Sequence, residues 1–125
     1  MHKMFTYGTL MKNQRNSFLM KKAKFLGDAV LENYCLYEIG TFPAAIPMNG
    51  FKVYGEVYEV SDEDKVLIDE LEDEGFLYTY KLVNVLMNNE LVEVGFYEFI
   101  DNKIDYPIRK PDGKWSSIRN DIDER

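Results

Sequence analysis

Aromatic and β-branched residues dominate most segments of this 125-residue chain, and only one short stretch has a strong helical period. Such residues favour strands, so the sequence predicts a sheet-rich α+β fold. Hydrophobic residues make up 46% of the chain, which is enough for one core, and the length does not allow a second. We therefore expect a single domain that spans residues 1–125.

Runs rich in strand-forming residues predict six strands, over residues 3–7, 24–31, 34–39, 51–60, 78–87 and 91–100. Glu32 and Asn33 are expected to join the second strand to the third. Asn88, Asn89 and Glu90 separate the last two strands, and asparagine tolerates the left-handed backbone angles of a tight hairpin.

The remaining segments are expected to be mostly irregular. Pro43 and Pro47 predict an ordered loop over residues 40–50, because proline cannot donate to a strand ladder. Residues 11–22 predict a loop that leads into a short helix. The tail after residue 101 is expected to be irregular.

The best helix begins after Ser61, which is the expected N-cap, and three acidic residues complement its positive end. At 100° per residue, Leu67, Ile68 and Leu71 fall on one face and Glu72 lies at the edge of that face. We expect Glu72 to point partly inward, where desolvation raises a carboxyl pKa into a range useful for proton transfer. The alternative is that this acidic helix end is a solvated surface.

Tyr7, Gly8, Thr9 and Leu10 end the first predicted strand. Glycine allows such a turn to present successive backbone N–H groups to a carboxylate or an oxyanion. A strand that ends in Gly-Thr is also common in turns that bind nothing, so this pattern alone leaves both interpretations open.

Charge and composition exclude several classes of function. Fifteen Lys and Arg residues against 22 Asp and Glu give a net charge of −7, which disfavours nucleic acids and anionic membranes as partners. A single cysteine, Cys35, excludes intramolecular disulfides, and a single histidine, His2, excludes a histidine-based triad and the usual zinc sites. We expect no metal and no cofactor, a cytoplasmic location, and carboxylates as the acid/base groups.

Five motifs follow one another along the chain: Tyr7–Leu10 with Asn16 and Leu19, Phe42–Ala44, Val53–Val60, Ile68–Glu72, and Leu77–Tyr78. In order and spacing, from about residue 4 to residue 100, they resemble the γ-glutamylcyclotransferase-like family. The similarity is strongest to its small bacterial members and to γ-glutamylamine cyclotransferase. The resemblance implies a small mixed barrel-like sheet flanked by short helices, with a cavity at the glycine loop.

The resemblance also implies roles for individual residues. Glu72 would be the catalytic acid/base, and the substrate would lie against the loop of Tyr7, Gly8, Thr9 and Leu10. A further set of aromatic residues, which also fits a plain core role, is expected to help line the cavity: Phe42, Tyr78 and Tyr97.

Members of this family cyclise a γ-glutamyl amine or amide. The α-amine of this small-molecule substrate attacks its own γ-carbonyl, which gives 5-oxoproline and a free amine, so no protein nucleophile is needed. Members often carry an arginine where this chain has Tyr80, so the preferred amine stays open. Two other functions remain: a non-catalytic binding or regulatory module with the same fold, and removal of a γ-glutamyl protecting group from a biosynthetic intermediate.

Overall fold

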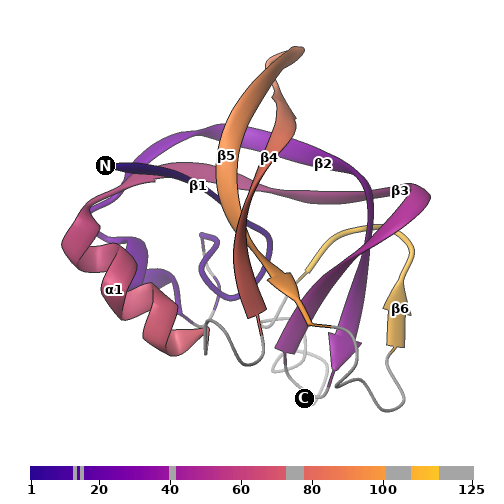
Figure 1. Cartoon of the computed structure of the whole chain (residues 1–125), viewed down its shortest axis with the longest axis horizontal. Helices are drawn as coiled ribbons and strands as arrows, with labels where there is room; N and C mark the ends of the chain where they lie inside the picture. Colours follow the sequence, from indigo (N-terminus) through magenta and orange to yellow (C-terminus); the bar gives the residue numbers. More distant parts are fainter. Residues whose placement is uncertain (13, 15, 40–41, 73–77, 101–107, 116–125) are drawn as a thin grey trace, which may run out of the picture.

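The computed structural model describes the chain except for residues 13, 15, 40–41, 73–77, 101–107 and 116–125. The elements in this described part are β1 (His2–Thr6), the 3-10 helix η1 (Ser17–Met20), β2 (Lys24–Ile39), β3 (Phe42–Val60), α1 (Asp62–Leu71), β4 (Tyr78–Met87), β5 (Glu90–Phe99) and β6 (Ile108–Lys110) (Figure 1).

The six strands form one mixed sheet in the order β3-β1-β5-β4-β2-β6, and β3 also pairs with β2. This extra pairing closes five of the strands into a ring, with β6 added beside β2 (Figure 1). The pairing of β1 with β5 is parallel, whereas its pairing with β3 is antiparallel. The α+β class and the mixed sheet predicted from the sequence are therefore confirmed.

The predicted break at Glu32 and Asn33 is wrong, because residues 24–39 form one continuous strand. Asn33 has a φ of 64°, and the register of β2 against β3 shifts between Glu32 and Tyr34. Between these two pairs β2 has the single residue Asn33, whereas β3 has the four residues 48–51. The extra residues therefore lie in β3, and β2 continues past this irregularity without ending. Asn33 takes a left-handed backbone angle, but it marks an irregularity in the ladder in place of a turn.

The predicted loop over residues 40–50 is also wrong from residue 42 onward, because β3 begins at Phe42. Residues 40–41 lie outside the described part of the structure. Pro43 lies opposite Glu38 and Pro47 lies opposite Tyr34 in the ladder with β2. The two prolines are four residues apart, so their backbones face the same way. β1 pairs with β3 only at residues 56–60. At Pro43 and Pro47 one edge of β3 therefore has no β1 partner, and a residue without an N–H group is tolerated at such an edge.

The helix begins as predicted, since the Ser61 side chain accepts a hydrogen bond from the Asp64 N–H at 3.1 Å. Its predicted inner face is partly wrong. Ile68 is fully buried, but Leu67 and Leu71 are 51% and 41% exposed. The side of the helix that faces the protein interior is narrow and centred between Ile68 and Asp69. Leu67 and Leu71 therefore lie on its outer side.

The hairpin between β4 and β5 is confirmed, and Asn88 and Asn89 have the expected positive φ values of 55° and 65°. Two clusters of buried residues form the core. One contains Phe5, Tyr7 and Phe96, and the other contains Leu10, Ile68, Tyr78 and Tyr97, among other residues. The loop that follows β1 therefore joins the two clusters. Within the described residues, no helix is long and apolar enough to cross a membrane.

Candidate active site

A small cavity lies at the end of β1, where segments from four parts of the chain meet. Its walls consist of Phe5, Thr6, Tyr7, Gly8, Thr9, Leu10, Pro43, Glu72 and Tyr97. The structure thus brings Glu72 and the four loop residues together in one place. These are the residues for which the sequence predicts catalysis and substrate binding.

Glu72 ends α1 as its C-cap, and its N–H donates to the Ile68 carbonyl at 3.0 Å. The side chain is partly buried, and the loss of water around it raises its pKa to about 7. A carboxyl group with such a pKa can both take and return a proton near neutral pH. Glu72 therefore has the properties of a general acid/base.

The loop after Tyr7 is a tight turn, in which the Met11 N–H donates to the Gly8 carbonyl at 3.1 Å. Asn16 holds the loop, because its Nδ2 donates to the Thr9 hydroxyl at 2.9 Å and its N–H to the Thr9 carbonyl at 2.8 Å. Among the described residues, the N–H groups of Gly8, Thr9 and Leu10 have no hydrogen-bond acceptor. They are available to an anionic or carbonyl oxygen.

Pro43 forms the opposite wall, and it lies against Gly8. The Tyr78 hydroxyl donates to the Pro43 carbonyl at 2.5 Å, so Tyr78 supports this wall from behind and does not line the cavity. Phe42 is the first residue of β3 and lies opposite Ile39, but its side chain is outside the described part of the structure.

Of the aromatic candidates whose side chains the structure describes, Tyr7 and Tyr97 line the cavity. The Tyr7 hydroxyl donates to the Tyr97 carbonyl at 2.6 Å, and burial raises the pKa of Tyr7. Sequence reasoning missed Pro43 as a wall residue, although it lies in the Phe42–Ala44 motif, because the prolines were interpreted as a loop signal. Asp69, three residues before Glu72, is half-buried on the same side of α1, which the helical period of the apolar residues does not predict.

The cavity has a volume of about 20 Å³, which corresponds to one or two water molecules. This space is far smaller than the roughly 300–1,000 Å³ typical of small-molecule pockets.

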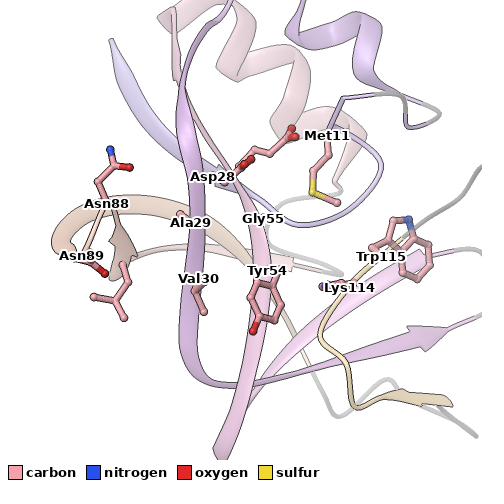
Figure 2. Close-up of a pocket in the computed structure, with 12 residues that line it drawn as sticks. Met11, Asp28, Ala29, Val30, Tyr54, Gly55, Asn88, Asn89, Lys114 and Trp115 are labelled. Atoms are coloured by element: carbon pink, nitrogen blue, oxygen red, sulfur yellow. The ribbon is translucent and has the colours of Figure 1, made fainter.

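A second, larger cavity of about 600 Å³ lies elsewhere (Figure 2). Asn88 and Asn89 lie at one side of it in this view, and Met11 and Trp115 lie at the other. Its size suits a small molecule. However, it includes neither Glu72 nor any of residues 7–10, so we assign the candidate chemistry to the smaller cavity.

The described residues contain no group of three or more His, Cys, Asp or Glu side chains arranged to hold a metal ion. Cys35 is buried, and burial raises the pKa of its thiol. It lines neither of these two cavities. Its environment therefore does not favour the thiolate that a cysteine nucleophile needs.

Comparison with known proteins identifies the family of this chain. Residues 4–117 match the family described as gamma-glutamyl cyclotransferase, AIG2-like. The Escherichia coli protein named gamma-glutamylcyclotransferase family protein YtfP is 40% identical over 81 residues, which are 65% of this chain and 71% of YtfP.

Two solved structures have a similar fold. The uncharacterized protein PH0828 from Pyrococcus horikoshii superposes with a TM-score of 0.75 and 30% identity, over 100% of this chain and 98% of PH0828. An AIG2-like protein from Mus musculus gives a TM-score of 0.74 and 27% identity, over 80% of this chain and 78% of the mouse chain. Because the family match covers most of the sequence and the fold agrees, this chain belongs to the AIG2-like gamma-glutamyl cyclotransferase family.

Proposed function

We propose that this protein is a γ-glutamyl cyclotransferase that converts a small γ-glutamyl amine or amide into 5-oxoproline and a free amine. Glu72 is the general acid/base, and the N–H groups of Gly8, Thr9 and Leu10 bind the substrate. The observation that carries the proposal is that the Glu72 carboxyl, with its pKa raised to about 7, lines the same cavity as the glycine loop.

In the proposed reaction, the neutral α-amine of the substrate attacks the γ-carbonyl carbon, and a new C–N bond closes a five-membered ring. The Glu72 carboxylate takes one proton from the attacking nitrogen. The protonated Glu72 then gives this proton to the amide nitrogen of the leaving group, and the original C–N bond breaks. Atoms and charge balance without a protein nucleophile or a cofactor.

The loop N–H groups have two possible partners in this reaction, the α-carboxylate of the substrate and the γ-carbonyl oxygen. An N–H aimed at the γ-carbonyl oxygen stabilises the negative charge that develops there, and loss of one such donor typically costs about 10²–10³ in rate. An N–H bound to the α-carboxylate instead orients the substrate for intramolecular attack, which can supply several kcal/mol. Both roles favour ring closure.

The test is a panel of γ-glutamyl amines and amides incubated with the purified protein, with 5-oxoproline measured by mass spectrometry. We expect 5-oxoproline and free amine in equal amounts, and at least about 100-fold slower release of 5-oxoproline from the Glu72→Gln variant. Release of 5-oxoproline from no member of the panel would contradict the proposal and favour a binding module.

A further inference from the structure

Asp69 connects helix α1 to the wall of the small cavity. Its Oδ1 accepts a hydrogen bond from the Tyr97 hydroxyl at 2.5 Å, and Tyr97 lies on β5 and lines the cavity. Lys65, one turn earlier on α1, donates to both carboxylate oxygens of Asp69 at 3.0 Å. Asp69 precedes Glu72 by three residues, so the two carboxylates occupy neighbouring positions on the helix.

The surroundings of Asp69 keep this hydrogen bond in place. The Lys65 ammonium balances the charge of Asp69 and lies 4.0 Å from the centre of the Tyr80 ring. The Tyr80 ring meets the Tyr97 ring edge-on at 5.0 Å. Tyr97 is only 4% exposed, and its burial together with the nearby Asp69 raises the pKa of its hydroxyl. The phenol therefore keeps its proton at neutral pH and remains a donor to Asp69.

Tyr97 also contacts the glycine loop through its backbone, because its carbonyl accepts the hydrogen bond from the Tyr7 hydroxyl. One residue of β5 is thus bonded to α1 through its side chain and to the end of β1 through its main chain. Glu72 ends α1 and Gly8 follows Tyr7. Two hydrogen bonds therefore link the element that carries the acid/base to the loop that carries the N–H donors.

We propose that Asp69 is a positioning residue for the Glu72 site. By holding the Tyr97 hydroxyl, it fixes the end of α1, and with it the Glu72 carboxylate, relative to the glycine loop. Asp69 acts through Tyr97 and does not touch the substrate. This inference rests on the proposed function, in which the distance between Glu72 and the loop N–H groups sets the rate. A misplacement of about 1 Å can cost about 10²-fold in rate.

The kinetic test is a double-mutant cycle of Asp69→Ala and Tyr97→Phe, assayed with a γ-glutamyl amine that the wild-type protein turns over. Each single change should lower kcat about 10- to 100-fold with a smaller effect on KM. The double variant should be no slower than the slower single variant, because both changes remove the same bond. Asp69→Asn keeps an oxygen acceptor and should recover part of kcat. Glu70→Ala, on the exposed side of the same helix, is the matched control and should leave kcat unchanged.

A second measurement does not depend on turnover. The pKa of Glu72 is followed by carbon NMR of the side-chain carboxyl in the wild-type protein and in Tyr97→Phe, which changes no charge. We expect the pKa to fall from about 7 toward the ordinary carboxyl value, because the loosened helix end lets water reach Glu72. Glu70→Ala should not produce this fall.

An unchanged Glu72 pKa in Tyr97→Phe would overturn the inference by itself, and so would losses in kcat that multiply in the double variant. Failure of the proposed function looks different. In that case the wild-type protein releases no 5-oxoproline, whereas the titration still decides whether the bond between Asp69 and Tyr97 positions Glu72.

Discussion

The Pro43 ring packs so closely against Gly8 that a Cβ atom on residue 8 would lie 2.3 Å from the Pro43 Cγ atom. Real Cβ atoms do not approach other carbon atoms to that distance. The proline ring is stiff, and the Tyr78 hydroxyl holds the Pro43 carbonyl from behind. Glycine at position 8 is therefore required by the opposite wall of the cavity.

We predict that Gly8→Ala lowers kcat/KM at least about 10-fold and destabilises the fold by about 1–3 kcal/mol, because the added methyl group overpacks the site. Denaturant unfolding and the 5-oxoproline assay measure the two effects. The double variant Gly8→Ala, Pro43→Ala removes the Cγ atom that clashes, and it should regain part of the lost stability. If Gly8→Ala matched the wild-type protein in both measurements, the close packing of this wall would not matter.

Glu72→Gln should lower kcat by at least about 100-fold, because the amide keeps the shape of the side chain but cannot accept the proton. Circular dichroism should show the same folded spectrum as the wild-type protein. Glu70→Gln makes the same chemical change on the same helix, at an exposed position, and should leave kcat unchanged. A folded Glu72→Gln protein that keeps more than about a tenth of the wild-type kcat would refute the acid/base role.

Stability should depend on pH through Glu72. Its pKa is raised from 4.5 to about 7 in the folded chain. Below pH 4.5, both the folded and the unfolded chain hold the proton. Between these two values the unfolded chain ionises while the folded chain keeps the proton, so the free energy of unfolding falls as pH rises, and it levels off above about 7.

A glutamine side chain at position 72 does not ionise, so the fall in the free energy of unfolding with rising pH should be absent from Glu72→Gln. Relative to the wild-type protein, the variant should be more stable by about 1–3 kcal/mol at pH 8 and equally stable at pH 4. Urea unfolding of the two proteins at both pH values measures the difference. An equal difference at the two pH values would show that the Glu72 pKa is not raised by folding.

An N-acetylated γ-glutamyl amine should not be turned over, because its α-nitrogen is neither basic nor nucleophilic. A hydrolase uses water or a protein group as the nucleophile and would still cleave this compound. The matched control is the same compound with a free α-amine, which should give 5-oxoproline as the initial product. Free glutamate as the initial product, or similar rates for the two compounds, would indicate hydrolysis instead.

Local signals in the sequence were sufficient for several parts of the fold. Ser61 marks the start of α1, and Asn88 with Asn89 marks the hairpin, because capping and left-handed angles depend on neighbouring residues alone. The mixed sheet follows from the family resemblance and the strand-forming residues. The structure also brings Tyr7 and Glu72 into one cavity, although no local pattern connects them.

The errors come from features that only the neighbouring strands decide. Pro43 was assigned to a loop because the sequence does not show which side of its strand lacks a partner. The prediction for Leu67 is wrong because the spacing of apolar residues gives a helix face but not its orientation toward the sheet. The side of α1 that faces inward contains the charged Asp69. The role of Tyr78 as a support for Pro43 likewise depends on a contact between residues far apart in the sequence.

The position of β1 in the ring sets the stage of refolding at which the small cavity can be completed. The hairpins β2–β3 and β4–β5 join neighbouring segments, whereas β1 lies between β3 and β5 and pairs Met4 with Gly95. Contacts between such distant residues form slowly, because a large loop must first close. The glycine loop follows β1 directly, so a chain with both hairpins in place but β1 unpaired would show strand-type circular dichroism and no turnover. Under the proposed function, the return of 5-oxoproline release during refolding therefore reports the insertion of β1 and not the formation of strands.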